Sequence, residues 1–305
     1  MSAASVRTLL DEGERRLRGA HAPASASQAT PSAQGSEREQ AVRDEPRRDA
    51  ELLMLQVVRQ SRAWLYAHGD EPLDAQSAQR FLALIARRAR GEPLAYILGT
   101  REFWSLELVV TPDVLIPRHE TELLVELALQ HIPQGEKVEI ADLGTGAGTI
   151  ALALARERPH ARVLATDASA AALEVARGNA QRLGIGNVEF ALGDWCAALG
   201  GRRMHGIVAN PPYVAAVDLH LVRGDLRFEP PIALSSGVEG LDAIRAIVRD
   251  APAHLLPGGW LLFEHGFEQG EGIRELMEKS GFVQVSTVRD LEHRERVSGG
   301  MMPPA

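Results

Sequence analysis

The tetrapeptide Asn210-Pro211-Pro212-Tyr213 has the residue types and spacing that point most directly to chemistry. It follows an apolar run at residues 206–209 that predicts a buried strand. The Asn210 side-chain oxygen and a backbone carbonyl near Pro211 could hold both N–H groups of a planar amide or amine, with Tyr213 against the flat group. Both prolines fix φ and lack an N–H, so the turn is stiff before a substrate arrives. The motif favours methyl transfer to a planar nitrogen, although an ordinary proline turn is the alternative for so short a motif.

A glycine-rich segment, residues 144–148, follows a predicted strand at residues 138–143 and precedes a helix predicted from about Thr149 to Arg158. Such a turn lets a ligand approach the backbone and meet free N–H groups. A dinucleotide site would need glycine at position 149, where threonine stands, so the spacing fits S-adenosylmethionine better than NAD. The residues of this segment expected to bind the cofactor are Gly144, Thr145, Gly146, Ala147 and Gly148.

Acidic residues follow three successive predicted strands. Asp142 could hold the ammonium of the ligand through water, and Asp167 could accept from both ribose hydroxyls. Asp194 offers an acceptor for the adenine amino group, and Trp195 offers a flat face for the ring. Each acid alone could be a loop cap or turn former. Together they mark the carboxyl ends of the strands, where open α/β sheets bind ligands.

The elements that must position these residues divide into two parts. A helix predicted over residues 2–18 opens an all-α N-terminal domain, residues 1–100. Residues 19–46 are rich in Ala, Ser, Pro, Gln and charge, so we expect an insertion that is disordered or a long loop. Further helices are predicted from about Arg48 to His68 and from about Asp74 to Arg90.

The second of these helices carries arginines on its predicted outer side. Two interpretations remain open, a solvated face and a docking surface for a macromolecular substrate. The residues concerned are Arg80, Arg87, Arg88 and Arg90.

Residues 101–118 follow, and alternation at residues 103–108 predicts a hairpin that links the two domains. A helix is expected at residues 120–131, and strands and helices then alternate to the end of the catalytic domain, residues 119–305. This order implies an α/β fold with a parallel, Rossmann-like sheet. Strands are expected to begin near residues 138, 162, 187, 205, 259, 282 and 295, with the last two as an antiparallel edge hairpin.

Composition narrows the possible functions. The chain has 305 residues, 45% hydrophobic and 24% charged, which suits a soluble protein with a sizeable core. A net charge of −8 argues against stable nucleic-acid binding. The single cysteine, Cys196, suits packing and a reducing cytoplasm. We expect no metal site, because none of the 10 histidines has a ligand spacing. No run is long enough to span a membrane, and no leader peptide is recognisable.

From about residue 48 to 298 the chain resembles the peptide chain release factor N5-glutamine methyltransferase family (PrmC/HemK). Four of its seven motifs are not general methyltransferase features, so the resemblance is specific. These four are residues 93–99, 101–104, 115–118 and 227–230. The motifs are residues 93–99 (Pro-Leu-Ala-Tyr-Ile-Leu-Gly), 101–104 (Arg-Glu-Phe-Trp), 115–118 (Leu-Ile-Pro-Arg), 142–148, 210–213, 227–230 (Arg-Phe-Glu-Pro) and 263–266 (Phe-Glu-His-Gly).

The resemblance implies an S-adenosylmethionine-dependent methyltransferase acting on the glutamine of the Gly-Gly-Gln loop in bacterial release factors. It implies that Phe103 lines the pocket for the glutamine, with Asn210, Pro211, Pro212 and Tyr213 as the other substrate residues; the alternative for Phe103 is an interdomain core aromatic. The helical domain would help to hold the release factor. We expect a monomer in the cytoplasm.

Other functions stay open. One alternative is the sister enzyme that methylates glutamine on a large-subunit ribosomal protein. Another is a DNA or RNA amino-methyltransferase, because adenine N6 would present the same flat nitrogen to the same turn. A non-catalytic protein that keeps the cofactor site is a third alternative. The chain departs from the family at His119, where many relatives have proline, in the segment 19–46, and in the tail 299–305.

Overall fold

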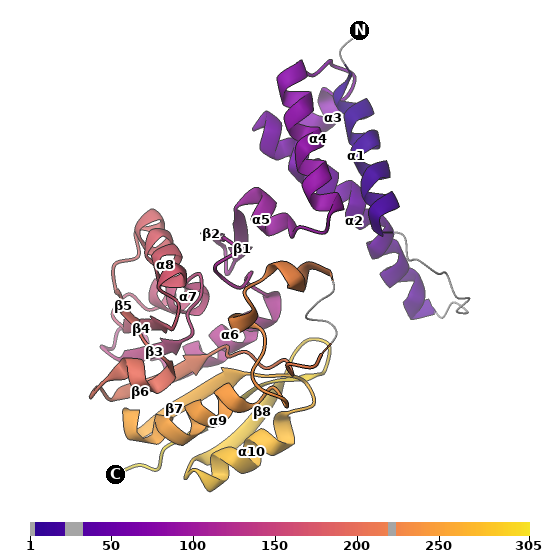
Figure 1. Cartoon of the computed structure of the whole chain (residues 1–305). Helices are drawn as coiled ribbons and strands as arrows, with labels where there is room; N and C mark the ends of the chain where they lie inside the picture. The colour runs from indigo at the N-terminus through magenta and orange to yellow at the C-terminus, as the bar shows by residue number, and fades with distance from the viewer. Residues whose placement is uncertain (1–3, 22–32, 219–223) are drawn as a thin grey trace. The chain divides into compact units, whose positions relative to one another are not determined.

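The structure, a computed structural model, describes residues 4–21, 33–218 and 224–305. The chain divides into two compact units, Met1–Leu98 and Gly99–Ala305 (Figure 1). Each unit has hydrophobic core residues of its own, so each can be understood as a separate folding problem.

The first unit is helical. Apolar residues at helical spacing give each long helix one buried stripe, and Leu17, Leu53 and Phe81 are fully buried where these stripes meet. Asp74 begins one helix by accepting the N–H of Ser77 at 2.9 Å. The helices described are α1 (Val6–His21), α2 (Ala33–Val58), α3 (Arg62–Ala67), α4 (Ala75–Ala89) and α5 (Leu94–Leu98).

The prediction of a loop or disorder at residues 19–46 is wrong where the structure describes this segment. Residues 19–21 end α1, and residues 33–46 are the first part of α2, while residues 22–32 lie outside the described residues. Residues 37–43 are mostly Glu, Gln, Arg and Ala, which favour helix, whereas the Pro- and Ser-rich composition belongs to the part before them. Pro46 lies inside α2, so its presence does not mark a helix boundary here.

The single helix predicted from Arg48 to His68 is also wrong. Arg59 has a left-handed φ of 53°, which ends α2, and Ser61 caps α3 by accepting the N–H of Trp64 at 3.3 Å. The apolar spacing continues across the break, so periodicity alone could not reveal it.

The basic face expected on α4 is smaller than predicted. Arg88 is 4% exposed and donates to Asp49 of α2 at 2.7 Å, so its outward placement is wrong. Arg87 pairs with Glu92. A buried arginine needs a partner carboxylate to offset its lost hydration, and α2 supplies one. Arg80 and Arg90 stay at the surface.

The second unit begins with the predicted hairpin, β1 (Thr100–Phe103) and β2 (Leu106–Val109), paired antiparallel. Trp104 and Ser105 form its turn with φ of 51° and 56°. Positive φ at both central residues matches the right-handed twist of the flanking strands. The Trp104 indole N–H donates to Glu157 Oε1 at 3.1 Å, which ties the turn to a helix of the same unit.

The main sheet has the order β5-β4-β3-β6-β7-β9-β8. Strand β9 pairs antiparallel with both of its neighbours, and the other pairings are parallel. The antiparallel hairpin predicted at the end of the chain is confirmed, although β9 lies between β7 and β8. The strands are β3 (Glu139–Leu143), β4 (Arg162–Asp167), β5 (Val188–Leu192), β6 (Met204–Ala209), β7 (Leu255–Glu264), β8 (Val283–Arg289) and β9 (Glu295–Met301).

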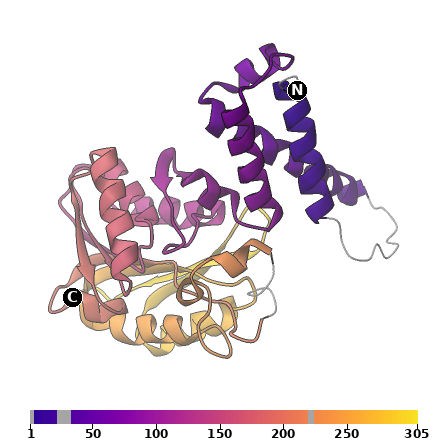
Figure 2. The same ribbon diagram turned by 45° about the horizontal axis from the view of Figure 1, so that its top comes forward.

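Helices cover both faces of this sheet (Figures 1 and 2). Helices α6, α7 and α8 contribute to one core, and α9 and α10 to the other. Their bounds are α6 (Glu122–His131), α7 (Thr149–Glu157), α8 (Ala170–Leu183), α9 (Asp242–Asp250) and α10 (Gly270–Lys279). The 3-10 turns are η1 (His119–Thr121), η2 (Trp195–Leu199), η4 (Gly224–Phe228), η5 (Pro231–Ala233) and η6 (Ala251–His254).

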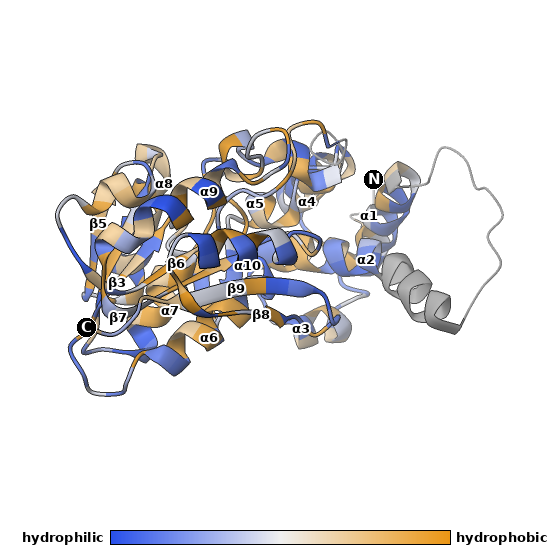
Figure 3. Ribbon diagram, turned by 90° about the horizontal axis from the view of Figure 1, so that it is seen from below, coloured by the Kyte–Doolittle hydropathy of each residue, from blue (hydrophilic) through white to orange (hydrophobic). Residues whose placement is uncertain are grey.

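Alternate residues of the central strands point to opposite faces of the sheet and contribute to the two cores there. Ile140 belongs to the core under α6 and α7, whereas Ala141 and Leu143 belong to the core under α9. Burial on both faces explains why these strands read as continuous apolar runs. In Figure 3 hydrophilic residues lie along much of α10, as expected for a helix with one outer face. Among the described residues no helix is both long and apolar enough to cross a membrane.

Candidate active site

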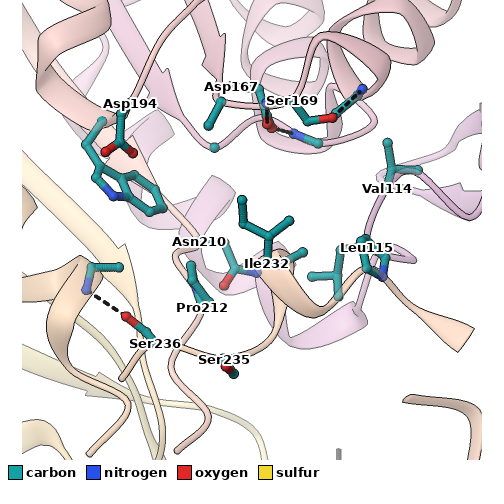
Figure 4. Close-up of a pocket in the computed structure, with 18 of the residues that line it drawn as sticks. Val114, Leu115, Asp167, Ser169, Asp194, Asn210, Pro212, Ile232, Ser235 and Ser236 are labelled. Carbon is teal, nitrogen blue, oxygen red and sulfur yellow. Dashed lines mark hydrogen bonds between the residues drawn. The ribbon is translucent and has the colours of Figure 1, made fainter. Parts of the chain in front are cut away.

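A cavity of about 380 Å³ lies at the carboxyl ends of the central strands of the second unit. Figure 4 shows Asp167, Ser169 and Asp194 on one side of it, with Asn210 and Pro212 facing them. Residues from the connections that follow β3, β4, β5 and β6 meet here because parallel strands all end at the same edge of the sheet. The cavity therefore lies where sequence reasoning expected a ligand.

The glycine-rich segment 144–148 forms one wall of the cavity. Gly144 and Gly146 have φ of 75° and 55° and both line the cavity. The N–H groups of Gly144 and Thr145 donate to the carbonyl of Thr166, and that of Gly146 donates to Asp167 Oδ2 at 2.9 Å. The segment therefore offers close approach to the backbone, and most of its N–H groups already have partners within the protein, contrary to the expectation of free donors.

Asp167 ends β4 and is held from two sides. Its Oδ2 accepts the N–H of Gly146, and its Oδ1 accepts the N–H of Ser169 at 2.8 Å. Ser169 in turn caps α8 by accepting the N–H of Ala172 at 3.2 Å. Each carboxylate oxygen keeps a second lone pair, so Asp167 is fixed in place and can still accept from a diol in the cavity.

Trp195 forms a flat wall near the glycine-rich segment. A Cβ added at Gly144 would meet the Trp195 ring at 3.2 Å, so glycine allows the ring to lie against the backbone. Trp195 itself has a φ of 40° and begins η2. Asp194 lines the same end of the cavity and is exposed, with its carboxylate available as an acceptor.

Asp142 lies beneath the glycine-rich segment and does not line the cavity. Its Oδ2 accepts from Thr145 Oγ1 at 2.7 Å and from the N–H of Ala151 at 3.0 Å. Its Oδ1 is buried and has no hydrogen-bond partner among the residues that the structure describes. Burial raises the pKa of Asp142 to about 7, against the lowering effect of these two donors. An unsatisfied buried carboxylate oxygen below a ligand loop is a feature that a cationic group of a ligand, or a water beside it, would satisfy.

The Asn210 turn belongs to a network of buried polar side chains. Asn210 Nδ2 donates to Thr121 Oγ1 at 3.0 Å, and Thr121 Oγ1 donates to Glu264 Oε2 at 2.7 Å. Tyr213 Oη donates to the other oxygen, Glu264 Oε1, at 3.1 Å. The stiffness expected from the two prolines is therefore reinforced by side chains from η1 and β7.

The backbone of the turn is supported from behind. Gln269 Nε2 donates to the Tyr213 carbonyl at 3.2 Å. A Cβ added at Gly240, where φ is 74°, would come within 2.2 Å of the same carbonyl oxygen. Only glycine allows this close approach.

A buried ion pair joins two segments that border the cavity. Glu229 has a fully buried side chain, pairs with Arg118, and accepts the N–H of Ile116 at 3.0 Å. Nearby positions in both segments, Leu115 and Pro230, line the cavity. The Leu-Ile-Pro-Arg and Arg-Phe-Glu-Pro motifs are thus joined by one ion pair, Arg118 with Glu229, which we call the clasp.

The structure brings together part of the predicted site. Seven of the predicted residues line the cavity, and seven lie behind or away from its lining. Those that line it are Gly144, Gly146, Asp167, Asp194, Trp195, Asn210 and Pro212. Those outside the lining are Phe103, Asp142, Thr145, Ala147, Gly148, Pro211 and Tyr213.

Phe103 is 1% exposed and packs in the core shared by β2, α6 and α7. It is therefore a core aromatic, as the alternative interpretation expected, although the core belongs to the second unit and is not interdomain. Sequence reasoning missed the wall formed by residues 232–246, including Ile232, which is 68% exposed. Its signal would have been the long crossover between β6 and β7, where only residues 227–230 were singled out. The polar partners Thr121 and Glu264 were also missed as site residues.

Cys196 is buried, and burial raises its pKa to about 12, as suits a packing residue. Within the described ranges no group of three or more His, Cys, Asp or Glu side chains could hold a metal ion.

Two families match the two parts of the chain. The PrmC N-terminal domain family matches residues 33–99, and the Methyltransferase small domain family matches residues 119–223. Among solved structures, a methyltransferase from Pyrococcus furiosus has a TM-score of 0.50 at 18% identity and covers 72% of this chain and 97% of its own. That likeness supports the fold alone, and the Rossmann-like methyltransferase fold predicted from the sequence is confirmed.

Similar proteins named release factor glutamine methyltransferase come from several bacteria. That of Xylella fastidiosa (strain Temecula1) is 54% identical over 84% of this chain and 93% of its own length. Those of Coxiella burnetii and Escherichia coli K12 are 50% and 45% identical, over 83% and 84% of this chain and 90% and 92% of their own lengths. The predicted resemblance is confirmed: this chain is a member of the release factor glutamine methyltransferase family.

Proposed function

We propose that this protein transfers a methyl group from S-adenosylmethionine to the side-chain amide nitrogen of the glutamine in the Gly-Gly-Gln loop of bacterial release factors. The observation that carries the proposal is the orientation of Asn210. Its Nδ2 is used by Thr121, which leaves its Oδ1 as the acceptor on the cavity side. An oxygen in that position suits an acceptor group that carries N–H.

The residues around the cavity fit S-adenosylmethionine. Asp167 would accept from the ribose hydroxyls, and Trp195 and Asp194 would take the adenine. The unpaired Oδ1 of Asp142 would meet the positive amino-acid end through water. When bound there, the cofactor supplies an electrophilic methyl group on a sulfonium.

The protein residues act chiefly by holding the acceptor amide. Asn210 Oδ1 and the Pro211 carbonyl would accept its two N–H groups, and the Tyr213 ring would limit its tilt. An amide nitrogen is a poor nucleophile, so its lone pair must be aligned with the methyl group. Positioning of this kind can lower a barrier by roughly 7–11 kcal/mol in intramolecular models. The methylated nitrogen is strongly acidic and can lose its proton to water, so the mechanism needs no dedicated base.

The helical unit, Met1–Leu98, would help to hold the release factor. The exposed Arg80 and Arg90 are what remains of the expected basic face of α4. We further propose that the protein works as a monomer in the cytoplasm, where its release factor substrates act.

The proposal is tested by offering the purified protein labelled S-adenosylmethionine with a release factor, a ribosomal protein or DNA in separate reactions. We expect label on the release factor alone, and mass spectrometry of its peptides should place one methyl group on the Gly-Gly-Gln glutamine. Label on the ribosomal protein or on adenine instead would refute the assigned substrate. Bound cofactor without transfer to any acceptor would refute the assigned activity.

A further inference from the structure

A buried carboxylate behind the cavity has no role in the proposed chemistry so far. Glu264, the last residue of β7, is 1% exposed. Burying a carboxylate is costly unless it accepts hydrogen bonds, and Glu264 accepts from Thr121 and Tyr213. Burial raises the pKa of Glu264, whereas these two donors and the charge of Arg296 lower it. The cost of this arrangement suggests that the network does more than fill space.

In the ionised form of Glu264, the chemistry of the three groups fixes the direction of every hydrogen bond. An ionised carboxylate can only accept, so the hydroxyls of Thr121 and Tyr213 each donate their one hydrogen bond to Glu264. The oxygen of Thr121 is then left as an acceptor toward Asn210, 3.0 Å from Nδ2. Thr121 therefore accepts the NH₂ of Asn210 and disfavours its carbonyl oxygen at that place.

This direction decides what Asn210 offers to the cavity. The oxygen and nitrogen of a carboxamide have nearly the same shape, so the turn by itself would allow both orientations. One orientation presents an acceptor to the cavity, and the other presents two donors. A substrate amide edge that carries N–H pairs with the first and clashes electrostatically with the second.

We propose that Thr121 and Glu264 are positioning residues that lock the Asn210 carboxamide with its oxygen toward the cavity, and so set the preference of the site for acceptors that present N–H. Neither residue lines the cavity, and both act through Asn210. The proposal deepens the proposed function and rests on it. The proposal also gives the Tyr213 hydroxyl a role, because it donates a hydrogen bond to the second oxygen of the same carboxylate.

The test compares Thr121→Val, which removes the hydroxyl at similar shape, with Thr121→Ser, which keeps it. Each is measured for kcat and KM with a release factor and for cofactor affinity by calorimetry. We expect Thr121→Val to lower kcat by about 10- to 100-fold with KM and cofactor affinity within about twofold of the original protein, and Thr121→Ser to restore most of kcat. Thr287→Val is a matched control, because it removes a hydroxyl from β8, where Thr287 bonds Ser298 and Arg274 and not Asn210.

A double-mutant cycle separates positioning from general packing. If Thr121 acts through Asn210, Thr121→Val should cost little further activity in an Asn210→Ala background. Additive losses, equal impairment by Thr121→Ser, or an unchanged kcat for Thr121→Val would each overturn the proposal. Failure of the original protein to methylate any release factor would instead refute the proposed function, and calorimetry would still report whether the cofactor site is intact in every variant.

Discussion

At the residue scale, the site depends on buried carboxyl groups whose pKa values burial shifts. Asp142 and Glu264 are the clearest cases, since both are carboxylates in the interior of the second unit with raised pKa values. Asp142 lies below the glycine-rich segment that forms one wall of the cavity, and Glu264 lies behind the Asn210 turn. One buried acid thus supports each half of the cavity.

The raised pKa of Asp142 predicts a specific dependence of stability on pH. Between its ordinary pKa of 3.8 and its folded pKa of about 7, the folded protein keeps a proton that the unfolded chain has lost. The stabilising contribution of this group is therefore complete below the lower value and is lost as pH rises through the higher one. Asp142→Asn removes the titration. Its free energy of unfolding, relative to the original protein, should rise by up to about 4 kcal/mol as pH increases across this range.

Urea unfolding of both proteins without ligand, at about pH 5 and about pH 8, should show about 3 kcal/mol of this change, because the titration begins below pH 5. Glu136→Gln, on an exposed turn, serves as the control and should show no comparable trend. A difference between Asp142→Asn and the original protein that stays constant with pH would contradict the assigned environment of Asp142.

Sequence reasoning identified residues by their place after strands, and this worked best where the backbone decides the geometry. Asp167, Asp194 and Asn210 all reach the cavity because parallel strands end at one edge. It could not find the pair of Thr121 and Glu264, which are separated by 143 positions, because contact between side chains that far apart leaves no local pattern.

At the element scale, two structural devices hold the walls of the site in place. The clasp of Arg118 with Glu229 joins the two segments that border the cavity. The β1–β2 hairpin closes the core beside α6 and α7 through Phe103 and Leu106. Its turn is strained, because Trp104 and Ser105 both adopt positive φ.

This strain predicts that Ser105→Gly stabilises the protein. Glycine adopts positive φ without steric cost, although it loses more conformational freedom on folding. We expect a net gain of about 0.5–1 kcal/mol in the free energy of unfolding, measured by chemical denaturation. Ser105 is exposed, so no packing is lost. Ser105→Ala keeps the strain and should show no such gain; an equal gain for both variants would argue against strain as the cause.

Elements with strong periodicity were predicted well, and boundaries set by single residues were not. Strands expected near residues 162 and 295 begin at Arg162 and Glu295. The break after Val58 depends on the left-handed Arg59 and on the Ser61 cap, which apolar spacing does not record. The helical start of α2 was missed because the composition of the whole segment 19–46 outweighed the helix formers in its second half.

At the scale of the whole molecule, the chain combines a helical unit with a methyltransferase unit that contains the entire cavity. Every residue that lines the cavity lies between Asp113 and Ala246. The second unit has both cores of the sheet within its own residues. Cofactor binding and acceptor chemistry should therefore belong to Gly99–Ala305, and recognition of the intact protein substrate to the whole chain.

This division predicts the behaviour of a fragment that spans residues 99–305. The fragment should fold and bind S-adenosylmethionine with the affinity of the full chain, because its cores and cavity are complete. With an intact release factor its KM should rise at least about tenfold, since the docking contacts proposed for the helical unit would be absent. Steady-state kinetics with a release factor and with a short Gly-Gly-Gln peptide measure the two parts separately. Unchanged KM for the release factor would contradict a docking role for Met1–Leu98.

The central claim is that Asn210 holds the edge of a carboxamide beside the methyl donor. Its most direct test is single-turnover methyl transfer by Asn210→Ala at saturating cofactor and release factor, with Asp167→Ala measured in parallel. The account predicts that Asn210→Ala lowers the transfer rate by about 100-fold or more while cofactor affinity stays within about twofold, and that Asp167→Ala weakens cofactor binding first. Transfer by Asn210→Ala at nearly the original rate would contradict it.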